Sequence, residues 1–288
     1  MGELLERESH VWNHGFTWAD HRGPFATVSP DQAAAFDRDG FFVLEGVFGP
    51  SEVSAMLDAI APGEQRVRDL LAMLPGQRFS VAGLDSQIVA PHLVGTSDLL
   101  RAVCAHRTLV GVCADLMGPD VRLYWEQAVC KQPDGAAPVL WHQDNGYTYV
   151  EPQDYLTCWI ALTDATPENG CIEAMAGVHR EGTLRHRETA IGFECWGDHD
   201  TAVSVPVRAG DVVVFSSLTP HATRVNTTDV VRAAYIVQYC HSGAVARTAA
   251  PDGSPGPAVA QDEPIRQFEV LRGGVRLEPP PLAGAAPS

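Results

Sequence analysis

The sequence predicts a mainly β fold with flanking helices, and the change in hydrophobic period along the chain supports this. Before about residue 120 apolar side chains recur at helical spacing, whereas beyond it they alternate with a period of two. The later runs are short, bounded by Pro, Gly, Asn or Asp, and joined by long connections; they cover 121–129, 155–162, 203–207, 212–215 and 233–239. Such strands indicate a double-stranded β-helix, a cupin-like jelly roll, with helices packed outside.

The first predicted element is a helix with signals at both ends. Ser29-Pro-Asp-Gln32 is typical of a helix start, with a Ser cap, Pro at the first helical position and Gln where a capping box needs it. Gly40 is the expected end of this helix. Residues 41–44, which are Phe-Phe-Val-Leu, then predict a short strand.

Two further helices are expected before the strands begin. One starts at Ser51 and places apolar side chains on one stripe, at Val53, Met56, Leu57 and Ile60. The longest helical pattern runs over 97–117 and is expected to stop at Gly118. Residues 62–95, with scattered Gly and Pro, show no readable pattern.

The length and composition favour one large domain. The chain has 288 residues, of which 45% are hydrophobic, so it can bury a sizeable core. We expect a single domain over 29–245, with a helical part at 29–120 and the jelly-roll core at 121–245.

The two ends of the chain differ from this domain in composition. Residues 1–28 are rich in aromatic side chains and predict an arm that packs on the domain surface, with a lid over the pocket or a dimer contact as alternatives. Residues 246–288 are rich in Pro, Gly and Ala, and 265–277 could hold one more strand. The last ten residues have a disordered composition.

Charge and cysteine usage narrow the class of ligand. A net charge of -16 and a pI near 5.0 oppose binding to nucleic acid or to an anionic membrane surface, so a small-molecule ligand is expected. The seven cysteines form no C-x-x-C pair, which argues against a disulfide framework and a cysteine zinc site. No secretory signal and no apolar run of 18 residues is present, so the sequence predicts a cytoplasmic location. Nothing in the sequence indicates the oligomeric state.

The chemical signal is a possible metal site built from His142, Asp144 and His221. His142 and Asp144 are two residues apart, so on a strand their side chains leave the same face. Two imidazoles and one carboxylate form the facial triad of non-haem Fe(II) oxygenases, which leaves three positions of the metal open. The His-x-Asp pattern alone is weak, because the similar His-x-Glu pattern occurs twice nearby, at 179–181 and 186–188.

Several blocks, in order and at consistent spacing, strengthen this interpretation. They are Lys131-Gln-Pro-Asp, Trp-His142-Gln-Asp144, Cys158-Trp159-Ile-Ala-Leu, Glu168-Asn-Gly-Cys-Ile, Ala176-Gly-Val-His179, Gly210-Asp-Val-Val-Val-Phe and His221-Ala-Thr-Arg-Val-Asn226, followed by Arg232. Over roughly 125–242 the chain thereby resembles the phytanoyl-CoA dioxygenase family. The resemblance implies an Fe(II)- and 2-oxoglutarate-dependent enzyme that converts 2-oxoglutarate and O2 into succinate and CO2 while oxidising a substrate.

A 2-oxo acid that chelates the metal needs a cation for its far carboxylate, and Arg232 is the candidate. It lies at the start of an apolar strand, and a guanidinium can grip a carboxylate through two hydrogen bonds. Arg224 is a rival, whereas Lys131 is expected to be an exposed charge beside a turn. By resemblance, Thr223, Gln127, Trp159 and Gln143 also bind the co-substrate, although Gln143 faces the opposite way on an ideal strand.

The retained Asp144 favours oxygen transfer, because the related halogenases lack this carboxylate. The resemblance implies hydroxylation of an unactivated C–H bond; desaturation, ring closure and epoxidation stay open. Candidate substrate contacts, from aromatic placement, are Tyr147, Tyr149, Phe193, Trp196 and Phe79, with Trp12 behind them. Without a basic cluster for nucleotide phosphates, a natural-product intermediate is favoured over a coenzyme A thioester.

Two other classes of function fit the same residues. A jelly-roll metal site can serve an isomerase, lyase or hydrolase that uses no 2-oxo acid, and Arg232 would then be structural. A non-catalytic binding protein could also keep the fold. Retention of both histidines, the aspartate and the arginine favours the oxygenase.

Overall fold

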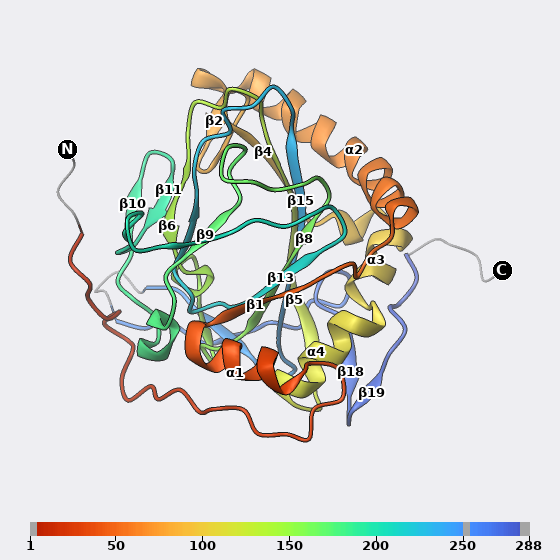
Figure 1. Ribbon diagram of the computed structural model, residues 1–288, viewed down its shortest axis with the longest axis vertical. Helices are drawn as coiled ribbons and strands as arrows, with labels where there is room; N and C mark the ends of the chain where they lie inside the picture. Colours follow the sequence, from red (N-terminus) through yellow and green to blue (C-terminus); the bar gives the residue numbers. More distant parts are fainter. Residues whose placement is uncertain (1–4, 250–253, 283–288) are drawn as a thin grey trace.

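A computed structural model describes residues 5–249 and 254–282, and it shows two facing antiparallel sheets with helices on one outer side (Figure 1). Figure 1 places three helices, α2 (Pro50–Met73), α3 (Asp98–Cys104) and α4 (Arg107–Met117), along one side. The hairpin of β10 (Arg187–Thr189) and β11 (Gly192–Glu194) lies on the other side. The expected fold class, a jelly roll with outer helices, is confirmed. Parts of the linker and tail predicted from composition, residues 250–253 and 283–288, lie outside the described residues.

The larger sheet carries the longest strands. Its order is β1 (Phe41–Leu44), β13 (Val212–Ser216), β8 (Leu156–Ala161), β15 (Arg232–His241), β5 (Val121–Lys131), β4 (Gln87–Pro91), β3 (Ala82–Gly83) and β2 (Arg78–Phe79). At the other end of β5, β18 (Glu269–Arg272) adds to the sheet and pairs with β19 (Val275–Arg276). The segment 265–277 therefore holds a hairpin rather than one strand.

Shorter strands form the opposite sheet and two small ribbons. The opposite sheet has the order β12 (Val203–Val205), β9 (Ile172–Ala174), β14 (His221–Thr223) and β6 (Val139–His142). The ribbons are β10 (Arg187–Thr189) with β11 (Gly192–Glu194), and β17 (Val259–Ala260) with β16 (Val245–Arg247) and β7 (Tyr149–Glu151).

Strands of the larger sheet are buried on both faces, which explains their apolar runs. In β8, Leu156, Cys158 and Ile160 join the core under the helices. The alternate residues Trp159 and Ala161 belong to a second apolar cluster that includes residues of the opposite sheet. Period-two alternation therefore assigns every second side chain of β5, β8 and β15 to the space between the sheets.

The helices cover the outer face of the larger sheet. They are α1 (Pro30–Asp39), α2 (Pro50–Met73), α3 (Asp98–Cys104) and α4 (Arg107–Met117), with 3-10 turns η1 (Pro75–Gln77), η2 (Leu93–Gly95), η3 (Asp144–Gly146) and η4 (Val178–Glu181). The start predicted for α1 is confirmed: Ser29 and Gln32 form a capping box, and Gly40 ends the helix in a left-handed conformation.

The prediction of a single helix over 97–117 is wrong, because the helix is interrupted at Ala105 and His106. His106 has an extended backbone with ψ of 134°, and it separates α3 from α4. The break turns two carbonyls away from a continuous helix. Cys104 O accepts a hydrogen bond from the Tyr239 hydroxyl, and Ala105 O accepts one from the Arg276 guanidinium.

Helix α2 runs further than the sequence indicated, through Pro62 and Gly63 to Met73. Gly63 permits a close approach to η2, since a Cβ at this position would lie 2.2 Å from Leu93 Cδ2. Packing of the helix on the sheet thus overrides two residues that normally weaken a helix.

The described part of the N-terminal arm packs along the outside of the domain (Figure 1). Trp18 is buried against Phe36, and its indole N–H donates to Asp37. Asp115 of α4 accepts the backbone N–H groups of 26–28.

The seven cysteines are all free and buried. No helix among the described residues is long and apolar enough to cross a membrane.

Candidate metal centre and cavity

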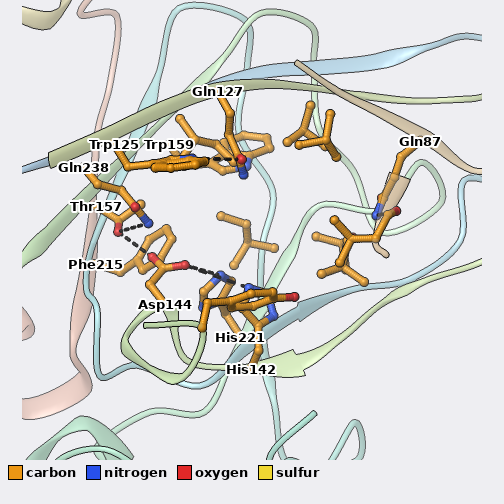
Figure 2. Close-up of a pocket in the computed structure, with 18 of the residues that line it drawn as sticks. Gln87, Trp125, Gln127, His142, Asp144, Thr157, Trp159, Phe215, His221 and Gln238 are labelled. Atoms are coloured by element: carbon orange, nitrogen blue, oxygen red, sulfur yellow. Dashed lines mark hydrogen bonds and ion pairs between the residues drawn. The ribbon is translucent and has the colours of Figure 1, made fainter. Parts of the chain in front are cut away.

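A cavity of about 330 Å³ lies between the two sheets. Figure 2 shows the labelled side chains from β4, β5, β8, β13 and β15 facing those from β6, η3 and β14. The lining residues are Val81, Gln87, Val89, Tyr124, Trp125, Gln127, Val129, Val139, His142, Asp144, Tyr147, Thr148, Tyr155, Thr157, Trp159, Ile172, Phe215, His221, Thr223, Arg232, Ile236 and Gln238. The described arm, residues 5–28, contributes nothing to this lining.

His142, Asp144 and His221 converge at one end of the cavity (Figure 2). His142 ends β6 and His221 begins β14, and the two residues face each other across the strand pair. Gln143 is extended, so Asp144 follows on the same side as His142. Asp144 Oδ1 lies 3.9 Å from Nε2 of each histidine, and the three ligand atoms lie within 4.8 Å of one another.

Hydrogen bonds and burial prepare this cluster for a metal ion. Nδ1 of His142 donates to Leu140 O at 2.8 Å and Nδ1 of His221 to Thr219 O at 3.0 Å, because a carbonyl can only accept. Both Nε2 atoms therefore keep a lone pair on the side of Asp144. Burial lowers the pKa of His142 well below its ordinary value, with the neighbouring His221 adding to the effect, so the imidazole is neutral as metal binding requires.

Thr157 and Gln238 extend the cluster and were not identified from the sequence. The Thr157 hydroxyl donates to Asp144 Oδ2 at 2.5 Å, and the Gln238 amide donates to Thr157 at 3.3 Å. Thr157 belongs to β8 and Gln238 to β15, which are paired at these two positions. The period-two pattern that places Trp159 inside also places Thr157 inside, and this signal could have found it.

Arg232 lies in the cavity wall and is almost fully buried. Its guanidinium stacks over the Trp159 ring, 5.2 Å from the centroid, and burial lowers its pKa to about 10. Nε and Nη1 have no hydrogen-bond partner, and no carboxylate in the described part of the chain pairs with this cation. A buried guanidinium without an anion is costly, so the arrangement is suited to a ligand carboxylate.

The sequence led us to expect Lys131 as an exposed charge beside a turn. This prediction is wrong, because Lys131 is fully buried. It lies directly opposite Arg232 in the pairing of β5 with β15, where the long side chain faces the protein interior. Its Nζ donates to the Thr223 hydroxyl at 2.9 Å and to Arg224 O at 2.6 Å. Burial first and the charge of Arg232 second lower the pKa of Lys131 to about 6.

The other predicted co-substrate contacts divide into two groups. Gln127, Trp159 and Thr223 line the cavity. Gln127 accepts a hydrogen bond from the Trp125 indole, which leaves its amide nitrogen as the group that can donate to a ligand. Arg224, the rival of Arg232, is ion-paired with Glu173 outside the lining.

Gln143 is the exception, because its side chain points away from the cavity and is fully buried among backbone groups. It accepts from Leu184 N and donates to Gly182 O and Leu218 O. The side chain therefore faces away from the cavity, as alternation along a strand predicts, and the co-substrate contact implied by the resemblance does not fit this geometry.

Among the predicted substrate contacts, Tyr147 alone lines the cavity. Its ring meets His142 edge-on at 5.3 Å, and Phe193 packs on it from outside at 5.1 Å. Tyr149 is buried elsewhere, where its hydroxyl donates to Trp12 O.

The last two predicted substrate contacts also lie outside the lining. Trp196 packs under the Arg7 guanidinium, and Phe79 is 72% exposed on β2. Aromatic placement alone does not predict which ring faces a cavity.

Two hairpin turns meet around Tyr147. Tyr147 forms a hydrogen bond with the backbone of Phe193 in β11 and keeps 38% of its surface exposed. A Cβ on Gly192 would lie 2.5 Å from Val81 Cγ1 and 3.1 Å from the Tyr147 hydroxyl. The β2–β3 and β10–β11 hairpins therefore hold this tyrosine beside the possible metal site.

Comparison with known proteins places the chain in a family. Residues 36–234 match the model of the phytanoyl-CoA dioxygenase family. The phytanoyl-CoA dioxygenase domain-containing protein 1 homolog of Caenorhabditis briggsae is 27% identical, over 70% of this chain and 87% of the relative.

Two solved structures share the fold. One is the non-heme alpha ketoglutarate dependent carbocyclase SnoK from nogalamycin biosynthesis, with 28% identity, a TM-score of 0.64, and coverage of 82% of this chain and 96% of that one. The other is the epimerase SnoN in complex with Fe3+, alpha ketoglutarate and nogalamycin RO, with 25% identity, a TM-score of 0.59, and coverage of 80% and 93%. The chain belongs to the phytanoyl-CoA dioxygenase family, and it is an iron- and 2-oxoglutarate-dependent dioxygenase.

Proposed function

We propose that this enzyme hydroxylates, or otherwise oxidises, an unactivated C–H bond of an uncharged small metabolite, with His142, Asp144 and His221 as the iron ligands. The observation that carries the proposal is the presence in one cavity of an open-faced His-Asp-His cluster and a buried, unpaired Arg232. When bound, iron and 2-oxoglutarate supply the oxidising power, with succinate and CO2 as co-products.

The chain's own residues position these groups. The imidazoles of His142 and His221 and the Asp144 carboxylate offer three ligands on one side of the ion. Arg232 would bind the far carboxylate of 2-oxoglutarate through its planar fork, and Thr223 would add a hydroxyl beside it. Lys131 lies behind Thr223, outside the cavity lining, and donates to that hydroxyl. Trp159 stacks on the Arg232 guanidinium, and Phe215 packs against His221 near Asp144 (Figure 2).

The lining indicates an uncharged substrate. Apart from the metal cluster and Arg232, the lining side chains are apolar, aromatic, hydroxyl or amide groups. Arginines on the hairpins near Tyr147 are already paired, Arg78 with Asp85 and Arg187 with Glu194, so they offer no phosphate site for coenzyme A. A free natural-product intermediate fits better, and SnoK, which resembles this chain, belongs to nogalamycin biosynthesis.

The outcome after hydrogen abstraction can differ between such enzymes. SnoK is described as a carbocyclase and SnoN as an epimerase, so ring closure and epimerisation occur among similar proteins. Among these outcomes we favour hydroxylation, because the chain retains the Asp144 carboxylate as a possible metal ligand.

A cytoplasmic location is supported by the seven cysteines, whose thiols are all free and buried, as a reducing compartment allows.

The test is an anaerobic titration of the apoprotein with Fe(II) and then with 2-oxoglutarate, followed by visible absorption. A weak charge-transfer band should appear in the wild type and disappear in His142→Ala, and Arg232→Gln should need far more 2-oxoglutarate to produce it. If iron binds but no band forms, the metal site stands and the 2-oxoglutarate role fails. That result would favour the metal-dependent isomerase, lyase or hydrolase.

A further inference from the structure

Gln143 stands between two of the proposed ligands, yet it serves the protein rather than the cavity. Its amide donates to Gly182 O at 3.0 Å and Leu218 O at 2.6 Å, and its carbonyl oxygen accepts from Leu184 N at 2.6 Å. Both polar atoms of a fully buried side chain are therefore satisfied. The identity of the two amide atoms is fixed, because the carbonyls can only accept and the backbone N–H can only donate.

One of these bonds connects the segments that carry the ligands. Leu218 O accepts from Gln143, and the next carbonyl along the chain, Thr219 O, accepts from Nδ1 of His221. The turn before β14 thus holds the third imidazole and also holds the residue between the first two ligands. These two bonds, together with the pairing of His142 with His221 across β6 and β14, hold the two imidazoles near each other.

His186 fixes the same residue from its backbone side. Its Nδ1 donates to Leu184 O at 2.9 Å, so Nε2 keeps a lone pair and accepts the Gln143 backbone N–H at 2.9 Å. Its ring also fills the space under the turn that follows Asp144. A Cβ on Gly146 would lie 2.1 Å from His186 Cε1.

We propose that Gln143 and His186 are positioning residues that hold His142, Asp144 and His221 in their metal-binding arrangement before the metal binds. This inference rests on the proposed function, because it takes those three residues as the ligands. Neither residue touches the metal position; each acts through backbone hydrogen bonds. Outer partners of this kind set the orientation of the ligands and so contribute to metal affinity.

The experiment compares Gln143→Leu with Gln267→Leu, which is a matched control. Gln267 also makes three hydrogen bonds through its side chain, to Tyr124 O, the Gln261 side chain and Glu263 N, away from the ligand segments. For each variant the thermal midpoint of the apoprotein and the anaerobic Fe(II) affinity are measured. We expect both variants to lose stability, but only Gln143→Leu to lose metal affinity, by about 10- to 100-fold.

A second pair of variants, at His186, tests the same positioning role in case Gln143→Leu does not fold. His186→Gln keeps an acceptor for the Gln143 N–H, whereas His186→Leu removes it. Iron affinity should be largely retained in the first and fall in the second. Equal iron affinity in wild type, Gln143→Leu and His186→Leu would overturn the positioning role alone. A wild type that binds no Fe(II), or binds it equally well as His142→Ala, would overturn the proposed metal site and this inference with it.

Discussion

The two ends of the cavity are built in different ways. The metal end comes from short pieces of chain, β6, η3 and β14, whose positions depend on hydrogen bonds from side chains to backbone carbonyls. The cation end comes from β5 and β15, two long paired strands that set Lys131 and Arg232 opposite each other. The metal end is therefore sensitive to loss of single hydrogen bonds, whereas the cation end depends on strand register and tolerates local change.

The largest effect is expected from removing a ligand at the metal end. His221→Ala should lower 2-oxoglutarate turnover by at least about a hundredfold, because several kcal/mol of metal catalysis are lost. The measurement is succinate formation under saturating Fe(II) and 2-oxoglutarate. His199→Ala is the control, since this imidazole donates a hydrogen bond to Glu173 outside the cavity lining, and its turnover should stay near that of the wild type. Equal losses in both variants would contradict the ligand role.

At the cation end, Arg232→Gln should weaken 2-oxoglutarate binding by about 10- to 100-fold. This is the loss of affinity expected when one charge-assisted hydrogen-bonded pair is removed. The same change should raise the thermal midpoint of the apoprotein, because it removes a buried cation that has no anion partner within residues 5–249 and 254–282. Calorimetric 2-oxoglutarate titration and thermal unfolding are measured on one preparation. Lower stability together with unchanged 2-oxoglutarate affinity would make Arg232 a structural residue.

Lys131 should make 2-oxoglutarate binding depend on pH. Above about pH 6 its amine is neutral in the folded protein, and a bound carboxylate favours its charged form, so binding takes up a proton. Affinity should therefore fall as pH rises above 6, by up to about tenfold per pH unit. Lys131→Met should remove this slope. Titration calorimetry in buffers of different ionisation enthalpy checks the proton uptake, and an absence of uptake would contradict the assignment.

The same lysine gives a second signature in the apoprotein. Its folded pKa of about 6 is lowered from 10.5, so between these values the unfolded chain binds more protons. The free energy of unfolding should therefore rise with pH across this window, and Lys131→Met should flatten the rise. Denaturant unfolding at pH 6.5, 7.5 and 8.5 provides the comparison, and an identical slope in both proteins would show that Lys131 is not the source.

The smallest effect is expected at Thr157, which supports the metal end from the larger sheet. Thr157→Val keeps the shape but removes the hydrogen bond to Asp144, and iron affinity should fall by about tenfold, the lower end of the range for such partners. Thr157→Ser keeps the hydroxyl and should restore the affinity. If valine and serine give the same iron affinity, the hydrogen bond has no part in metal binding.

The sequence predicted most of what is local in this molecule. The cap at Ser29, the strand at 41–44 and the spacing of His142 and Asp144 each depend on residues within one element, and the structure shows all of them. The alternation rule also placed Gln143 on the far face. Features of this kind are set by neighbouring residues, so the local sequence is enough to predict them.

What depends on distant contacts could not be predicted. Lys131 looked exposed because its burial is set by pairing with a strand that begins about a hundred residues later. The break at His106 and the continuation of α2 past Pro62 are settled by packing against the sheet. Tyr149 and Tyr147 could not be told apart, because only the meeting of two hairpins at Gly192 decides which ring faces the cavity.

The seven buried cysteines have a practical consequence. Each thiol lies in the protein interior, where burial raises its pKa and keeps it protonated at neutral pH. The native surface therefore presents no reactive thiol to a maleimide dye. A cysteine introduced at the exposed Phe79 would accept a single fluorophore without removal of any natural residue elsewhere. Its emission would report on the surroundings of the β2–β3 hairpin, whose Val81 lines the cavity.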